Sequence, residues 1–186
     1  TAYPQAQKAV EEYFPLQADA LYRGMTENFE YFCGEGGIAV GLGYMPIEVA
    51  CDAIIAPMRT DSQVLSFSYG GSFYRGEGTL YNNTYYEGVV FDTSTGKRLR
   101  LEDVVNDTDD FLRFAKAYVV LSVYNDENFM QTYSDTWNMP TVKLEIEKEQ
   151  WYFTENGMAI ICNPEEKDYF TIIEHIFVIP YGALLD

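Results

Sequence analysis

Gln63-Val64-Leu65-Ser66-Phe67-Ser68-Tyr69 decides the fold, because large apolar side chains alternate in it with small polar ones. A period of two residues is typical of a β-strand with one buried face. The same period runs through 46–57, where apolar residues occupy every second position from Ile47 to Ile55, and a polar turn at 58–62 separates the two stretches. We therefore predict that 46–57 and 63–69 form an antiparallel β-hairpin.

A second hairpin is predicted near the C-terminus by Glu155-Asn156-Gly157. Asn-Gly tolerates the positive φ angles of a tight turn, and here it stands between two strand-like stretches, 150–154 and 158–162. Further strands are expected at 85–91, 98–101 and 169–179.

Two stretches have helical periodicity. From Pro4 to Phe32, apolar side chains recur every three or four residues, and we expect Pro15 to kink this helix or divide it. A second helix is predicted to begin at Thr108, a residue type that suits an N-cap, and to carry an apolar stripe as far as Ser122. Together the elements predict an α+β fold, with an antiparallel sheet and two main helices packed on one face.

The length of the chain suits one hydrophobic core, since it has 186 residues. We predict a single domain over 1–186, with the first helix and hairpin in 1–70 and the remaining sheet and helix in 71–186. The formal net charge is −17. A field of this sign repels nucleic acid and attracts cationic partners, so we expect no nucleic-acid partner, although acidity also serves solubility alone.

No membrane-spanning segment and no cofactor are predicted. The sequence has no apolar run of about 18 residues, the length that a spanning helix needs. Because the chain begins at Thr1 rather than Met, we expect that an upstream segment was removed, and that the chain meets a membrane only through such a segment. The cysteines, Cys33, Cys51 and Cys162, have no spacing that predicts a disulfide framework or a metal site.

The order of these motifs resembles the extracytoplasmic domain of RsiV-type anti-sigma factors, and a related domain that precedes the catalytic part of some peptidoglycan deacetylases. The best marker is the stretch Phe91-Asp92-Thr93-Ser94-Thr95-Gly96-Lys97 with the residues 98–104 that follow it. The other landmarks are the leading helix, Val64–Gly71, Trp151–Met158 and Ile179-Pro180-Tyr181. The chain departs from the family pattern at 163–170, where relatives often carry an Ala-Pro-Tyr segment, and a ligand that contacts this segment would differ here.

The resemblance implies a non-catalytic binding or sensing domain without a cofactor, on the outer face of a bacterial membrane. Some relatives bind lysozyme, a strongly cationic protein, and this binding exposes the anti-sigma factor to proteolysis. The expected partner is therefore a cationic, lysozyme-like protein or a cell-wall glycan. The expected location is extracytoplasmic, either secreted or anchored to the cell surface.

The strongest candidate for a ligand-binding surface is the stretch from Tyr69 to Tyr86. Rigid aromatic rings among small polar residues suit a protein interface or stacking against sugar rings. Glycines at 70, 71, 76, 78 and 88 are expected to bend the backbone and expose the rings. The predicted ligand-binding residues are Tyr69, Phe73, Tyr74, Glu77, Tyr81, Tyr85 and Tyr86. The alternative is that these rings belong to the core, because half of any strand faces inward.

No catalytic or metal site is predicted. His175 is the only histidine, and no cluster of His and Cys has the spacing of metal ligands. A nucleophile pair of Cys162 and His175 is conceivable, since hairpin neighbours can meet, but no activating group is visible. The alternative function is a hydrolase of cell-wall glycan or peptide that uses acidic residues such as Glu165 and Glu174.

Overall fold

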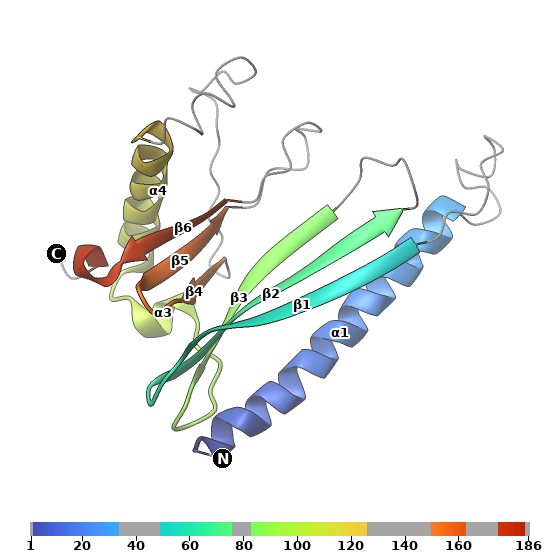
Figure 1. Cartoon of the computed structure of the whole chain (residues 1–186), viewed down its shortest axis with the longest axis horizontal. Coiled ribbons are helices and arrows are strands. Elements are labelled where there is room, and N and C mark those ends of the chain that lie inside the picture. Colours follow the sequence, from blue (N-terminus) through green and yellow to red (C-terminus); the bar gives the residue numbers. More distant parts are fainter. Residues whose placement is uncertain (1, 34–48, 76–82, 126–149, 163–174, 185–186) are drawn as a thin grey trace.

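The computed structural model describes residues 2–33, 49–75, 83–125, 150–162 and 175–184, and it confirms the α+β class (Figure 1). A long helix comes first, then a three-stranded sheet, a second long helix and a smaller three-stranded sheet. The elements in chain order are α1 (Pro4–Cys33), β1 (Val49–Thr60), β2 (Val64–Arg75), β3 (Asn83–Asp92), α3 (Leu101–Val104), α4 (Thr108–Asn125), β4 (Trp151–Phe153), β5 (Gly157–Cys162), β6 (His175–Pro180) and the 3-10 helix η2 (Tyr181–Leu184).

The strands form two antiparallel sheets where we expected one. Sheet A has the order β1-β2-β3, and sheet B has the order β4-β5-β6. Both predicted hairpins are confirmed, because β1 pairs with β2 and β4 pairs with β5. Residues 46–48 of the first predicted strand and 169–174 of the last lie outside the described residues.

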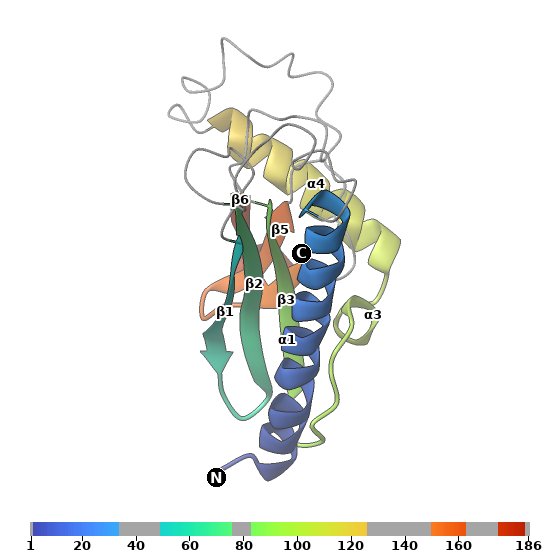
Figure 2. The same ribbon diagram turned by 90° about the vertical axis from the view of Figure 1, so that its right-hand side faces the viewer.

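One face of sheet A is aromatic and lies against α1, which runs along the sheet (Figure 2). Alternation along β2 directs Phe67 and Tyr69 to this face. The ring of Phe14 on α1 meets both, with centroid distances of 5.3 Å to Phe67 and 5.9 Å to Tyr69. Phe91 of β3 belongs to the same buried cluster. Burial of these rings holds α1 on the sheet.

The opposite face of sheet A carries small side chains where β4 crosses it closely. The hydroxyl of Ser66 accepts a hydrogen bond from the backbone N–H of Phe153 at 2.8 Å. Ser68 is hydrogen-bonded to the side chain of Tyr152, whose pKa is raised by burial and lowered in part by this bond. The two serines therefore supply polar partners to a strand of the other sheet.

Gly88 lies at the closest approach of the two sheets. A Cβ atom at this position would overlap the carbonyl oxygen of Trp151, so only glycine lets the two backbones pass. We expected Gly88 to bend the strand; β3 pairs with β2 in unbroken register from Asn83 to Asp92, so no bulge forms there.

The larger core cluster lies around sheet B and α4. Four successive residues of β5, Met158–Ile161, are buried, so both faces of this central strand are covered. Ala115 and Val119 of α4 join the cluster, as do Val64 and Val90 of sheet A. The cluster therefore connects the two sheets and the second helix.

The helices begin and end near their predicted bounds, with two differences. α1 is one helix through Pro15, which neither divides it nor ends it. The N-cap of α4 is Asp107 rather than Thr108, because the Oδ1 atom of Asp107 accepts a hydrogen bond from the backbone N–H of Asp110 at 3.0 Å.

The turn after β3, the best marker of the family resemblance, is held by its own side chains. The carboxylate of Asp92 accepts hydrogen bonds from the hydroxyl and backbone N–H groups of Ser94 and Thr95, at 2.6 to 2.9 Å. These bonds lower the pKa of Asp92 to about 2. Gly96 has a φ of 72°, and a Cβ atom there would lie 2.6 Å from the carbonyl oxygen of Gln5. The turn therefore packs against the first turn of α1.

The strand predicted at 98–101 is wrong. Only Arg98 pairs with β3, in an isolated bridge to Phe91, and α3 begins at Leu101. The carboxylate of Asp103 accepts a hydrogen bond from the backbone N–H of Arg100 at 2.9 Å, which favours a helix start over a continued strand.

Candidate functional site

The predicted ligand-binding surface needs correction at its first residue. Tyr69 is 1% exposed and belongs to the cluster that packs α1 on sheet A, so its ring is not available to a ligand. The reason is alternation, because Tyr69 falls on the same face of β2 as Leu65 and Phe67. At Tyr69, the alternative interpretation, that the ring belongs to the core, is confirmed.

Four of the other predicted residues belong to sheet A, whose far end extends away from sheet B (Figure 1): Phe73 and Tyr74 in β2, and Tyr85 and Tyr86 in β3. Tyr86 is half-buried and packs against the larger core cluster. For three residues the structure describes the backbone, in β2 or β3, but not the side chain: Phe73, Tyr74 and Tyr85. Glu77 and Tyr81 lie outside the described residues.

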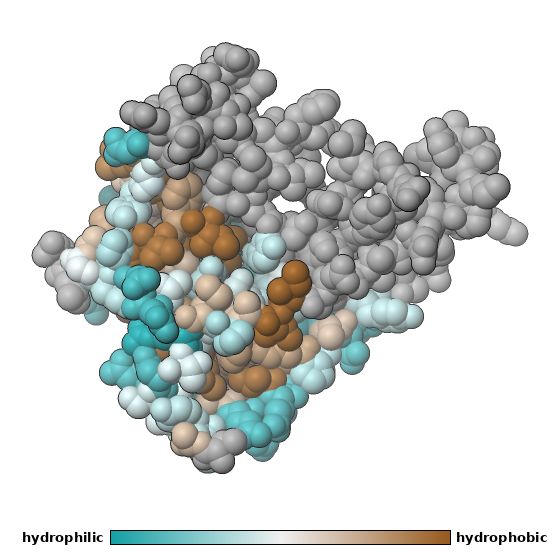
Figure 3. Space-filling view, in the orientation of Figure 1, coloured by the Kyte–Doolittle hydropathy of each residue, from teal (hydrophilic) through white to brown (hydrophobic). Residues whose placement is uncertain are grey.

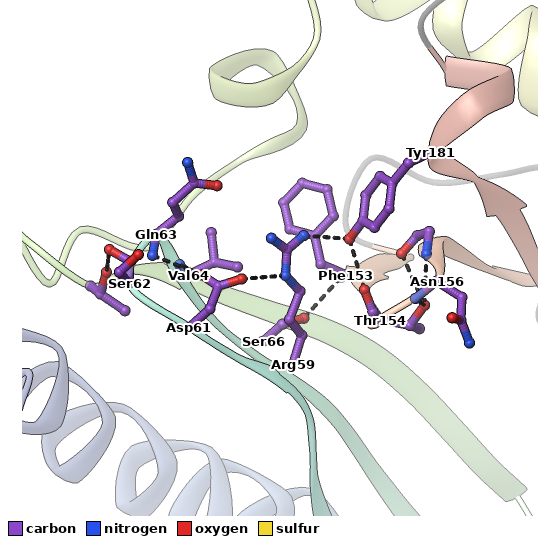
Figure 4. Close-up of polar contacts among 12 residues, drawn as sticks. Arg59, Asp61, Ser62, Gln63, Val64, Ser66, Phe153, Thr154, Asn156 and Tyr181 are labelled. Carbon is purple, nitrogen blue, oxygen red and sulfur yellow. Dashed lines mark hydrogen bonds and ion pairs between the residues drawn. The ribbon is translucent and has the colours of Figure 1, made fainter.

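A polar cluster joins the two sheets where β1 passes β4 and η2 (Figure 4). The guanidinium of Arg59 pairs with Asp61 at 2.6 Å and donates to the hydroxyl of Tyr181. It also lies over the rings of Phe153 and Tyr181, at 5.7 and 5.2 Å from their centroids. Tyr181 in turn donates to the backbone carbonyl of Thr154 at 2.7 Å.

This polar cluster acts as a structural connection. The carboxylate of Asp61 accepts hydrogen bonds from the backbone N–H groups of Val64 and Gln63, at 2.9 and 2.7 Å, as well as from Arg59. The bond from Val64 is the largest cause that lowers the pKa of Asp61. Because the charged groups bond to one another and to turns, we do not assign the ligand site to them.

A pocket lies between β3, the segment 97–100, α3 and β4, and we take it as the candidate site. Its volume is about 680 Å³, which is in the range of sites for small organic ligands. The described residues that line it are Gly88, Lys97, Arg98, Leu99, Arg100, Glu102, Asp103 and Trp151.

The pocket gathers positive charge in an acidic chain. Lys97, Arg98 and Arg100 are three of the 12 basic residues in the sequence. Nζ of Lys97 lies 2.5 Å from Asp103, and Nη1 of Arg100 lies 3.7 Å from Glu102. The hydrogen bond from Lys97 is the largest cause that lowers the pKa of Asp103. The described part of the lining has three positive and two negative side chains and therefore a net charge of +1.

Arg98 differs from Lys97 and Arg100 in its partner, which is an aromatic ring rather than a carboxylate. Its guanidinium lies over the ring of Tyr13, 5.0 Å from the centroid. Across the ranges that the structure describes, no carboxylate forms an ion pair with it. Burial raises the pKa of Tyr13, and the charge of Arg98 opposes that shift. The ring therefore positions the guanidinium without cancelling its charge.

The edge of β3 adds backbone groups to the pocket. Asp92 donates its N–H to the carbonyl of Lys97 at 2.9 Å, and Val90 accepts from the N–H of Leu99 at 2.8 Å. These residues therefore point their backbone groups away from β2. Alternation in an antiparallel ladder directs the N–H and C=O of Gly88 to the same edge, beside the pocket.

Apolar side chains also reach the surface on two edge strands. Ile54 and Ile55 of β1 and Ile176 and Val178 of β6 are exposed, and Figure 3 shows hydrophobic surface over both strands. Nothing in the structure shows what covers these side chains, so they do not define a site.

The residues considered for catalysis are only partly described. The register of sheet B places Cys162 directly opposite His175, but their side chains lie outside the described part, as do Glu165 and Glu174. Within the described ranges, no three His, Cys, Asp or Glu residues are grouped so that they could hold a metal ion. No described helix is both long enough and apolar enough to cross a membrane.

Sequence reasoning missed the pocket because it treated 92–101 as a turn followed by a strand. A signal was present, since three basic residues stand within four positions, 97–100, of a strongly acidic chain. Their convergence with Gly88 and Trp151 depends on the crossing of the two sheets, which no local pattern predicts.

No protein-family model matches the chain, and no curated protein matches it. The resemblance to RsiV-type ectodomains therefore remains a proposal that depends on the order of the motifs.

Proposed function

We propose that the chain is a non-catalytic binding or sensing domain of the bacterial cell surface, similar in role to the ectodomains of RsiV-type anti-sigma factors. Its ligand is a cationic, lysozyme-like protein or a cell-wall glycan. The observation that carries the proposal is charge, because 29 acidic residues against 12 basic ones give a net charge of −17. Such a field steers cationic proteins toward the surface and speeds their association.

We place the protein ligand on the predicted residues other than Tyr69, of which Phe73, Tyr74 and Tyr85 belong to the far end of sheet A. This end of the sheet extends away from sheet B, so residues there are separated from the junction that holds the two sheets together (Figure 1). Interface hot spots favour tyrosine, because a rigid ring buries a large area at a low entropic cost.

A binding assay with hen lysozyme, at low and at high salt, tests the function. We expect a complex at low salt that weakens as salt rises, whereas a neutral protein of similar size shows none. Retention on purified peptidoglycan tests the glycan version of the same proposal. If neither lysozyme nor peptidoglycan is bound at low salt, the proposal is wrong.

Substitutions separate the proposed ligand surface from the core. Tyr74→Ala or Tyr81→Ala should weaken binding by about 2 kcal/mol if the ring is an anchor, with an unchanged melting temperature. Tyr69→Ala should instead lower the melting temperature, because that ring is buried. If Tyr74→Ala and Tyr81→Ala change stability and leave affinity intact, the ligand surface is elsewhere.

A hydrolase is the second candidate, and one observation favours it. Cys162 and His175 are directly opposed in register, as a nucleophile and its base on neighbouring strands would be. Release of soluble fragments from peptidoglycan by the purified chain, lost in Cys162→Ala and in His175→Gln, would establish this function. Under the binding proposal, the wild-type chain releases none.

A further inference from the structure

We infer that the pocket between β3, the segment 97–100, α3 and β4 is a binding site for a small organic anion, recognised through a carboxylate. This site is distinct from the ligand surface proposed above, because it lies where β4 crosses sheet A rather than at the far end of the sheet (Figure 1). Neither proposal depends on the other.

The first reason is the local concentration of positive charge. Lys97, Arg98 and Arg100 line one pocket of a chain whose net charge is −17. At physiological salt, the acidic groups farther away than about 8 Å are largely screened, so the nearby cations decide which ions enter. The acidic groups of the chain repel a monovalent carboxylate less than they repel a phosphate dianion. We therefore assign a carboxylate.

The second reason is that Glu102 already occupies the position of such a ligand. The Glu102 carboxylate lies 3.7 Å from Nη1 of Arg100, where we expect the ligand carboxylate to bind. The side chain of Glu102 is 52% exposed and that of Arg100 is 76% exposed. Exposed ion pairs contribute little to stability, so an incoming carboxylate can replace Glu102 at a small cost. The planar guanidinium can then bind the ligand through two parallel hydrogen bonds.

The third reason is that the remaining lining suits an organic molecule rather than a bare ion. The ring of Tyr13 holds the guanidinium of Arg98 in place, and the backbone N–H of Gly88 lies on the same edge. The partly buried Leu99 adds apolar surface to a volume of about 680 Å³. A carboxylate with an organic body would therefore contact cations at one end and apolar atoms at the other.

Isothermal titration calorimetry with 3-phenylpropionate, a monovalent organic carboxylate, as the probe tests the inference, with its neutral amide 3-phenylpropionamide and inorganic phosphate as comparison ligands. Wild-type protein should bind 3-phenylpropionate and not 3-phenylpropionamide. Arg98→Gln should weaken binding about tenfold, because one charge-assisted contact is lost. Glu102→Gln should strengthen it about threefold, because Arg100 loses its internal competitor.

Arg113→Gln is the matched control, because it removes one positive charge from α4, where Arg113 pairs with Asp110 away from the pocket. Arg98→Lys keeps the positive charge but not the planar guanidinium, and it replaces Arg98→Gln as the test variant if Arg98→Gln lowers the melting temperature. The inference is overturned if 3-phenylpropionate does not bind, if 3-phenylpropionamide binds equally well, or if phosphate binds and 3-phenylpropionate does not. It is also overturned if Arg98→Gln and Arg113→Gln weaken binding equally, or if Glu102→Gln does not strengthen it. None of these results bears on lysozyme or peptidoglycan binding.

Discussion

The two faces of sheet A are built from one alternating stretch, yet they pack in opposite ways. Toward α1 the sheet presents large rings, and Phe14 of the helix fits between Phe67 and Tyr69. Toward β4 it presents Ser66, Ser68 and Gly88, which leave room for a backbone to cross. The first face is held by apolar area, and the second by close approach and hydrogen bonds in addition to the apolar contacts of Val64 and Val90.

The difference predicts how each face responds to change. A helix can shift on a layer of rings, because side chains separate the two backbones. Two backbones in direct contact have no such freedom, since a side chain inserted between them has nowhere to go. Substitutions on the β4 face should therefore depend on size, and substitutions on the α1 face on lost apolar area.

The largest effect is expected from Gly88→Val. The new side chain would overlap the carbonyl of Trp151, and β4 would have to move away from sheet A. We expect a loss in the free energy of unfolding larger than the roughly 1 to 3 kcal/mol of ordinary overpacking, because a Cβ atom at Gly88 would lie 1.4 Å from a backbone oxygen and the two backbones would have to separate. Gly182→Ala is the control, since nothing lies within 4 Å of a Cβ atom built there. Equal stability of the two variants would show that the sheets do not cross as described.

Loss of a ring from the α1 face should come next. Phe14→Ala removes the ring that contacts β2 and should reduce the free energy of unfolding by about 3 to 4 kcal/mol. Leu16→Ala, on the same helix but 65% exposed, should change it by less than about 1 kcal/mol. Urea denaturation measures both. Similar losses for the two variants would mean that α1 is not docked through Phe14.

Much of this fold could be predicted from local pattern. The alternation in 63–69 correctly gave a strand and its two faces. Asn156-Gly157 correctly placed the second hairpin, although neither residue has the positive φ on which that prediction was based. Periodicity could not show that the strands divide into two sheets, because that depends on which small residues accept a crossing strand. A sequence does not distinguish a glycine that lets two backbones touch from a glycine that bends a strand. We predicted that Gly88 bends the strand, whereas it lets the backbone of Trp151 approach.

The candidate site was harder to predict for the same reason. Tyr69 satisfied every criterion for an interface ring, yet its place in the alternation put it in the core. Lys97, Arg98 and Arg100 form a pocket only because α3 turns back beside the β3 edge. The landmarks of the family resemblance that the structure describes, such as the Asp92 turn and Tyr181, hold elements together and do not by themselves identify a ligand.

A smaller effect is expected from Ser66→Ala on the β4 face. The substitution leaves the backbone N–H of Phe153 without its acceptor, and an unsatisfied buried donor costs about 1 to 2 kcal/mol. Thr60→Ala, at an exposed position of β1, is the control and should be close to neutral. Thermal unfolding of the two variants measures the difference. If Ser66→Ala is also neutral, the β4 face depends on shape alone.

The smallest effect, and the one that can separate the two faces, is expected in acid. The turn at Asp92 supports the α1 face, because Gly96 packs against Gln5 at the start of the helix. The pKa of Asp92 is lowered from 3.8 to about 2 by hydrogen bonds within the turn, from Ser94 first and then from Thr95. A carboxyl group with a lower pKa in the folded chain stabilises the fold above its unfolded pKa, so this contribution should be lost as pH falls from about 4 to about 2.

Amide hydrogen exchange across that pH window can follow the two faces separately. The contacts between Ser66, Ser68 and β4 involve hydroxyl and backbone groups that do not titrate in acid, whereas the turn under α1 does. We therefore expect the first turns of α1 to lose protection at a higher pH than β4. Asp92→Asn should reduce the pH dependence of α1 protection. The asparagine side chain does not titrate between about pH 4 and about pH 2, so the turn has no carboxylate charge to lose in this range. If α1 and β4 lose protection together in wild-type protein, the two faces unfold as one unit and the turn does not anchor the helix.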